Sequence, residues 1–188
     1  MTYLTEGIVL KKENYRDFDC QYVIYTKKRG KVLAIAKGAK KITSKLNPHL
    51  EFFLIANLML ADGSFCSRVA AAQIAKSFKE VRGDLTKVLA AVYALEAVDV
   101  LIKYDFADEP VFEFIENFLG RLSLAPSLAE VLMSVNQFLF DFLSHLGYCP
   151  IIRAKNQKAL FKDLNDLVQE TGERQMKSFG SFGRMLVC

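Results

Sequence analysis

The fold of this chain is decided by residues 20–37, which read CQYVIYTKKRGKVLAIAK. Residues 20–26 are rich in β-branched and aromatic side chains, which fit the pleated surface of a strand. Residues 27–30 predict a turn because Gly30 is free to adopt a positive φ, and residues 31–37 predict the returning strand. The stretch therefore predicts a β-hairpin with basic residues gathered at its turn.

Three further strands are expected around this hairpin. Residues 6–12 precede it, and residues 51–60 and 65–72 follow it as a second hairpin. The turn of that second hairpin contains Asp62-Gly63, a dipeptide typical of tight β-turns. Five strands in about 75 residues, without a strong helical pattern between them, predict a small closed barrel of the OB or SH3-like kind.

The rest of the chain has helical spacing. Asp84 and Pro110 suit the starts of two helices. Residues 127–130 form a capping box for a third helix, and a fourth is expected at about residues 157–170. The glycine-containing residues 178–184 are interpreted as a short jointed segment and not as a phosphate-binding loop, because no strand precedes them.

The expected fold class is therefore α+β. Residues 1–79 are predicted to form a five-stranded, basic, OB-like barrel that binds nucleic acid, and residues 80–188 an α-helical bundle domain. The longest apolar run is too short to span a bilayer, and the N-terminus lacks the basic and apolar parts of a signal peptide. We therefore expect a cytoplasmic protein without a membrane partner.

The composition argues against a cofactor and against catalysis. Four cysteines stand far apart with no Cys-x-x-Cys pair and only two histidines beside them, so neither a zinc site nor a disulfide is expected. The histidines His49 and His145 have no local partner that would activate a nucleophile. No metal, no other cofactor and no enzymatic activity are predicted.

Positive charge is concentrated in the first half of the chain. Residues 1–50 carry eleven Lys or Arg against four acids, whereas the overall net charge is only +4. A small β domain with this charge at its strand ends is typical of proteins that bind a polyanion. The candidate contacts are Lys11, Lys12, Arg16, Lys27, Lys28, Arg29, Lys31, Lys37, Lys40, Lys41 and Lys45.

Aromatic residues interleave with these cations. Tyr15, Tyr22 and Tyr25 are candidates for base stacking, and Phe18 lies among them. Barrels that bind nucleic acids combine cations that follow the phosphates with aromatic rings that stack on bases. The alternative is that the lysines only keep the strand edges soluble and that Tyr22 or Tyr25 fills the barrel.

The order of motifs resembles the RecO family of bacterial recombination mediators, which act in DNA repair. The matching residues are Thr5–Lys11, the sequence from Tyr25 to Val32, the basic stretch 34–45 and Leu146–Pro150. The resemblance implies an OB-fold followed by a helical domain. Many members carry a four-cysteine zinc site after the Leu-Gly-Tyr-x-Pro segment, which this chain lacks, and the chain also ends earlier than a typical member.

The resemblance also implies a function and partners. A member binds single- and double-stranded DNA, anneals complementary strands, works with RecR and contacts the acidic tail of single-strand-binding protein, so that RecA can load. A nucleoid-associated location follows. The DNA surface would include Lys37, Lys40, Lys41 and Lys45, and Arg121 and Arg153 are candidates for holding the protein tail. The alternatives are a protein-interaction adaptor that binds no DNA and an RNA-binding OB module.

Overall fold

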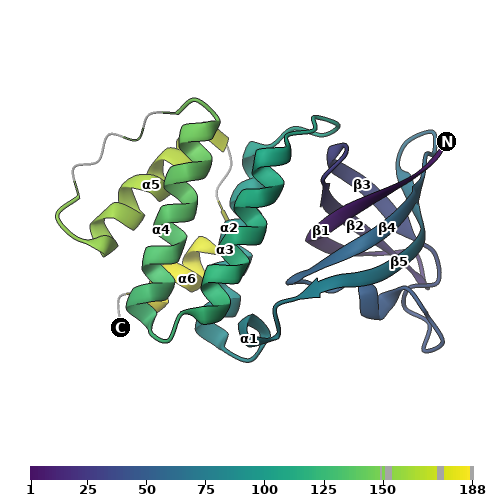
Figure 1. The fold of residues 1–188 in the computed structure, drawn as a ribbon, viewed down its shortest axis with the longest axis horizontal. Coiled ribbons are helices and arrows are strands. Elements are labelled where there is room, and N and C mark those ends of the chain that lie inside the picture. Colours follow the sequence, from purple (N-terminus) through teal and green to yellow (C-terminus); the bar gives the residue numbers. More distant parts are fainter. Residues whose placement is uncertain (149, 151–153, 173–175, 187–188) are drawn as a thin grey trace. The chain divides into compact units, whose positions relative to one another are not determined.

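The structure is a computed structural model that describes residues 1–148, 150, 154–172 and 176–186. The chain forms two compact units (Figure 1). The first comprises Met1–Ser77 and Ile102–Phe112, and the second comprises Phe78–Leu101 and Glu113–Cys188. The chain thus leaves the first unit after residue 77 and returns to it at residues 102–112. The expected division into folding domains at residues 79 and 80 stays a prediction.

The first unit contains a closed five-stranded barrel (Figure 1), which confirms the predicted OB-like architecture. The strand order is β1-β2-β3-β5-β4, and β4 pairs again with β1. All neighbours are antiparallel except β3 and β5, which are parallel. The strands are β1 (Thr2–Tyr15), β2 (Asp19–Thr26), β3 (Gly30–Ala36), β4 (Leu54–Ala61) and β5 (Ser67–Ser77).

β1 is longer than the predicted residues 6–12 because it has two partners. Thr2–Ile8 pairs with β4, and Gly7–Tyr15 pairs with β2. The register shifts between Val9 and Lys11, and a bulge of this kind bends a strand and increases its twist. One strand can therefore belong to both sides of the barrel and close it.

The barrel core is built from alternate residues of each strand. Tyr22 and Ile24 of β2, Ala34 of β3 and Leu60 of β4 have no exposed surface. Side chains along a strand point alternately to its two faces, so the apolar residues at every second position fill the interior. The hairpin of residues 20–37 therefore contributes Tyr22, Ile24 and Ala34 to the barrel core.

The seam between β3 and β5 is short. These strands pair only at Ala34↔Ser67 and Ile35↔Arg68. Tyr104 forms a single parallel bridge with Lys31 farther along the same edge of β3. Between these points, no described segment pairs with Val32 or Leu33 on this side of β3.

Residues 102–112 are fixed to the β2–β3 hairpin. The backbone N–H of Asp105 donates to the Lys31 carbonyl oxygen at 2.9 Å, and the Tyr25 hydroxyl donates to the Asp108 carbonyl oxygen at 2.8 Å. Gly30 has φ 64°, and a Cβ at this position would lie 1.8 Å from the Phe106 carbonyl oxygen. Glycine is therefore required here both for the turn and for the close approach of this segment.

The second unit is helical, as predicted. Its core includes Tyr93, which packs against Phe161 at 5.1 Å and against Phe182 at 5.7 Å between ring centroids, and whose hydroxyl lies 3.1 Å from Asn165 Oδ1. No helix in the described part of the chain is long and apolar enough to cross a membrane. The helices are α1 (Lys79–Arg82), α2 (Leu85–Leu101), α3 (Glu109–Leu124), α4 (Leu128–His145), α5 (Gln157–Gly172) and α6 (Phe179–Met185).

The predicted helix caps are confirmed. Asp84 Oδ1 accepts from the backbone N–H of Thr86 at 2.8 Å, and Ser127 Oγ accepts from that of Glu130 at 3.4 Å. The interpretation of residues 178–184 as a jointed segment was wrong, because they lie within the short helix α6 and its N-cap. Burial of Phe182 against the core of this unit stabilises α6 despite its glycines.

Candidate nucleic-acid interface

The turn between β1 and β2 and the loop after β3 lie at the same end of the barrel. Cys20 pairs with Ala36, so the turn that precedes Cys20 and the loop that follows Ala36 are neighbours. We call residues 16–18 and 37–45 the basic loop pair. All of its cationic residues are exposed, namely Arg16, Lys37, Lys40, Lys41 and Lys45.

Three hydrogen bonds hold the two loops together. The Lys40 ammonium donates to the Arg16 carbonyl oxygen at 2.9 Å, and the Lys40 backbone N–H donates to the Phe18 carbonyl oxygen at 3.0 Å. The Gly38 backbone N–H donates to Asp19 Oδ1 at 2.8 Å. These bonds join segments that are about twenty residues apart in sequence, so the cations of both loops form a single surface.

Aromatic rings accompany these cations. Phe18 is 58% exposed, and the Lys41 ammonium lies 5.5 Å from its ring centroid. The Arg16 guanidinium lies 5.1 Å from the ring centroid of Tyr15, which is partly exposed. A ring beside a cation is the combination on which a base stacks while its phosphate is neutralised.

The cations of the basic loop pair form no ion pairs with described residues, although the exposed Asp17 lies among them. Among the described residues, no carboxylate oxygen lies within 4.0 Å of the charged nitrogen atoms of its five cationic side chains. Exposed cations that share a small area raise the local potential and attract a polyanion. This end of the barrel therefore has the electrostatics that a phosphate backbone needs.

The predicted residues of β1 lie outside this surface. Lys11 forms an ion pair with Glu13 at 2.6 Å, and Lys12 forms one with Glu51 at 2.8 Å. Lys12 also donates to Asn47 Oδ1 at 3.2 Å. Their charges are thus partly balanced by side chains of the barrel itself.

The β2–β3 turn lies at the opposite end of the barrel, and two of its three basic residues form ion pairs. Lys27 lies 3.0 Å from a carboxylate oxygen of Glu109. Arg29 donates to both carboxylate oxygens of Asp62, at 2.6 and 3.4 Å. The guanidinium holds the pKa of Asp62 below its usual value, and the same hydrogen bond raises the pKa of Arg29. Lys28 is exposed.

Three of the predicted contacts are buried. Lys31 is only 5% exposed, because its ammonium donates to the Ile102 carbonyl oxygen at 3.0 Å and lies 4.4 Å from the Tyr104 ring centroid. Tyr22 and Tyr25 have no exposed surface, and burial raises the pKa of both hydroxyl groups. The structure therefore corrects their assignment to DNA contact and stacking: Tyr22 fills the barrel, while Tyr25 and Lys31 bind residues 102–112.

In the helical unit, Arg121 lies on the exposed surface of α3. It lines a hollow of about 380 Å³ together with Leu124, Met133 and Glu130. Leu124 is 84% exposed and Met133 is 53% exposed, so the hollow combines apolar surface with a cation. Arg153 lies outside the described residues.

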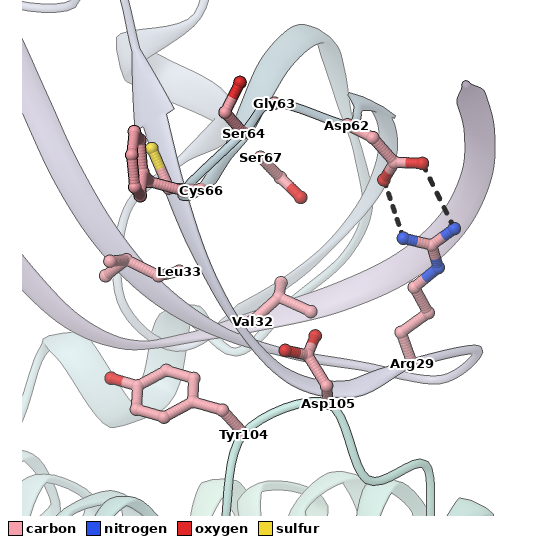
Figure 2. A pocket seen from close by; sticks show the side chains of 11 residues that line it. Arg29, Val32, Leu33, Asp62, Gly63, Ser64, Cys66, Ser67, Tyr104 and Asp105 are labelled. Carbon is pink, nitrogen blue, oxygen red and sulfur yellow. Dashed lines mark hydrogen bonds and ion pairs between the residues drawn. The ribbon is translucent and has the colours of Figure 1, made fainter.

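A cavity of about 590 Å³ lies beside the open part of the β3–β5 seam (Figure 2). Val32 and Leu33 line it from β3, residues 62–67 line it from the β4–β5 loop, and Tyr104 and Asp105 line it from residues 102–112. Apart from the Asp62-Gly63 turn, no sequence pattern marks these residues, because the cavity exists only when residues 102–112 lie against β3.

The described residues contain no group of three or more His, Cys, Asp or Glu side chains placed to hold a metal ion. Cys20 is buried and Cys66 is partly exposed, and both are free thiols. The features of the described residues that could bind a ligand are therefore the exposed cations, the aromatic rings beside them and the cavity at the β3–β5 seam.

Comparison with known families gives two adjacent matches. Residues 1–78 match the model described as the N-terminal domain of recombination protein O, and residues 82–156 match that of its C-terminal domain. The fold and the two matches thus define the class as a recombination protein with a barrel domain followed by a helical domain. The chain belongs to the RecO family.

Individual relatives agree with this assignment. The DNA repair protein RecO of Symbiobacterium thermophilum is 32% identical over 152 residues, which cover 81% of this chain and 59% of that protein. That of Roseiflexus sp. strain RS-1 is 30% identical over 148 residues, which cover 79% of this chain and 51% of that protein. The chain therefore spans little more than half the length of these relatives.

Proposed function

We propose that this chain is a non-enzymatic DNA repair mediator that binds single- and double-stranded DNA through the basic loop pair. In this role it anneals complementary strands and, with RecR, helps to load RecA onto DNA coated by single-strand-binding protein. The observation that carries the proposal is the set of five exposed cations of the basic loop pair, none of them paired with a described carboxylate, with Lys41 over the exposed Phe18 ring.

Electrostatics explains how such a surface promotes annealing without a catalytic centre. Two DNA strands repel each other through their phosphates. Cations that neutralise phosphates release condensed counterions, which favours binding and makes affinity fall as salt rises. A basic surface that engages both strands lowers their repulsion and brings their bases within pairing distance.

The direct test is charge reversal at Lys40 and Lys41. We expect Lys40→Glu/Lys41→Glu to weaken binding of single-stranded DNA by about tenfold or more and to reduce the slope of log K against log salt by ~1.4, because each phosphate contact contributes about 0.7. A matched control is Lys158→Glu/Lys162→Glu, two exposed lysines one turn apart on α5. It imposes the same change in net charge on the helical unit.

Equal DNA affinity and salt slope in wild type and Lys40→Glu/Lys41→Glu would contradict the proposal and favour the adaptor alternative. Matched DNA and RNA oligonucleotides at one salt concentration test the RNA alternative, because an RNA reader uses the 2′-hydroxyl. Annealing of strands coated by single-strand-binding protein tests the mediator role itself. We expect wild-type chain to accelerate it and Lys40→Glu/Lys41→Glu to do so far less.

The proposed contact with an acidic, apolar protein tail is supported by the hollow beside Arg121. A peptide of this kind needs a cation next to apolar surface, and Leu124 and Met133 supply that surface. Glu130 lines the same hollow and would repel an acidic tail. We therefore expect Arg121→Gln to weaken binding of the tail peptide and Glu130→Gln to strengthen it. Wild-type affinity for the tail peptide in both variants would place the tail elsewhere.

A further inference from the structure

We infer that the cavity at the β3–β5 seam binds one unstacked base of a DNA single strand that continues along β3 to the basic loop pair. The inference rests on the proposed function and adds to it a site for a base. In this site Phe65 and Tyr104 stack on the base, and the Asp105 carboxylate accepts a hydrogen bond from it.

The position of the cavity makes a continuous DNA path feasible. Leu33 lines the cavity, and Lys37 follows Ala36, the last residue of the same strand. At about 3.3 Å per residue, the four residues from Leu33 to Lys37 cover ~13 Å along β3. Arg68 is exposed and pairs with Ile35 across the seam. It therefore lies between the cavity and the basic loop pair, where it supplies a cation.

The aromatic lining favours a base as the ligand. Phe65 is fully exposed and Tyr104 is 49% exposed, and both line the cavity. An aromatic ring left in water gains free energy when a base covers it, and this gain depends little on the identity of the base. The Tyr104 ring is held in position by the Lys31 ammonium at 4.4 Å, so it is ordered before a ligand arrives.

The charges around the cavity exclude a phosphate and leave room for a neutral group. Figure 2 shows the Asp105 carboxylate directed toward the space below Val32, and Asp62 joined to Arg29 by two hydrogen bonds. Among the described residues, no hydrogen bond or ion pair engages the Asp105 carboxylate, which acts on the Arg29 guanidinium only through its charge. It therefore repels a phosphate but can accept a hydrogen bond from an amino group of a base.

The Asp105 carboxylate can select among bases by their amino groups. Asp105 has φ 57°, in the left-handed region that aspartate adopts more readily than most residues other than glycine. Cytosine, adenine and guanine carry an exocyclic amino group, and thymine does not. The cavity should therefore prefer cytosine to thymine between the two pyrimidines.

Fluorescence can test stacking directly, because the chain has no tryptophan. We expect the indole of Phe65→Trp to be quenched when oligo-dC binds. Leu85→Trp, which places an indole at an exposed position of the helical unit (Leu85 is 73% exposed), should not be quenched. Phe65→Ala should weaken oligo-dC binding by about tenfold, whereas Leu85→Ala should not.

The carboxylate is tested by Asp105→Gly, since glycine adopts this φ freely. We expect the ratio of oligo-dC to oligo-dT affinity to fall in this variant, a ratio that cancels the general effect of removing a negative charge. An unchanged ratio would overturn the role of Asp105. An unquenched Phe65→Trp together with full affinity in Phe65→Ala would overturn the base site. If Lys40→Glu/Lys41→Glu still weakens DNA binding in that case, the proposed function stands, whereas wild-type chain that binds no DNA overturns both.

Discussion

The Lys31 ammonium donates a buried hydrogen bond to the Ile102 carbonyl oxygen at 3.0 Å. The Tyr104 ring covers the same ammonium, and the backbone N–H of Asp105 returns a hydrogen bond to the Lys31 carbonyl oxygen. One residue of the β2–β3 hairpin thus binds residues 102–112 with both its side chain and its backbone. A lysine that looks like part of a basic surface in the sequence is a structural residue.

This relationship predicts a loss of stability when the Lys31 ammonium is removed. Lys31→Met keeps the aliphatic stem but leaves the Ile102 carbonyl oxygen without its charged donor, so we expect the free energy of unfolding to fall by about 2 kcal/mol. Urea unfolding measures this change. Lys28→Met, at an exposed position of the same turn, should change stability by less than about 0.5 kcal/mol. Free energies of unfolding that agree within about 0.5 kcal/mol between Lys31→Met and wild type would contradict the structural role of Lys31.

Phe18 should contribute to DNA binding and little to stability. Because its ring is 58% exposed beside Lys41, Phe18→Ala should lower single-strand affinity by about tenfold through loss of stacking. Fluorescence anisotropy at one salt concentration measures the change. Ile42→Ala removes a still more exposed side chain from the other loop of the basic loop pair and should have little effect. Equal losses in both variants would indicate a general change in the loop.

Asp62 should titrate unusually low. The Arg29 guanidinium lowers the pKa of Asp62 from its ordinary value of 3.8. The ion pair therefore stabilises the folded state above about pH 4, and this contribution is lost as the pH falls through the lowered pKa. Carboxylate titration by NMR should show the pKa of Asp62 returning toward 3.8 in Arg29→Gln. Arg68→Gln, a change at a neighbouring exposed arginine, should leave it low.

Two neighbouring tyrosines of β2 should respond to loss of the hydroxyl group with opposite signs. The buried Tyr22 hydroxyl has no oxygen or nitrogen partner among the described residues and meets only the Cys20 thiol, a weak hydrogen-bonding group, so Tyr22→Phe should raise the free energy of unfolding by about 1 kcal/mol. The Tyr25 hydroxyl donates to the Asp108 carbonyl oxygen, so Tyr25→Phe should lower it by about 1 kcal/mol. Thermal or urea unfolding of both variants measures these changes. Changes in the free energy of unfolding that have the same sign in both variants would contradict this account.

The parts of the fold that depend on local chemistry were predictable from the sequence. The hairpin of residues 20–37 and the caps at Asp84 and Ser127 are confirmed because neighbouring residues determine them. The N-terminal end of β1 was not predictable, since residues 2–5 are held in the strand by pairing with β4, about fifty residues away. Helix α6 was missed because the burial of Phe182, and not helix propensity, stabilises it.

The candidate interface was predictable only in part, for the same reason. The sequence identifies which residues are basic but not which carboxylates meet them. Glu109 lies 82 residues after Lys27 and still forms its ion pair, and Asp62 pairs with Arg29 across 33 residues. The loops that carry Lys40 and Phe18 could be predicted as exposed and basic because their charge and exposure do not depend on distant partners.

The return of residues 102–112 to the barrel has a practical consequence for cutting the protein into pieces. A fragment that ends at residue 79 would keep all five strands but lose the carbonyl oxygens that bind Lys31 and Tyr25. It would have to expose a lysine ammonium and a tyrosine hydroxyl that the intact chain buries. A faithful barrel fragment should instead join residue 77 to residue 102 through a short flexible linker that replaces α1 and α2.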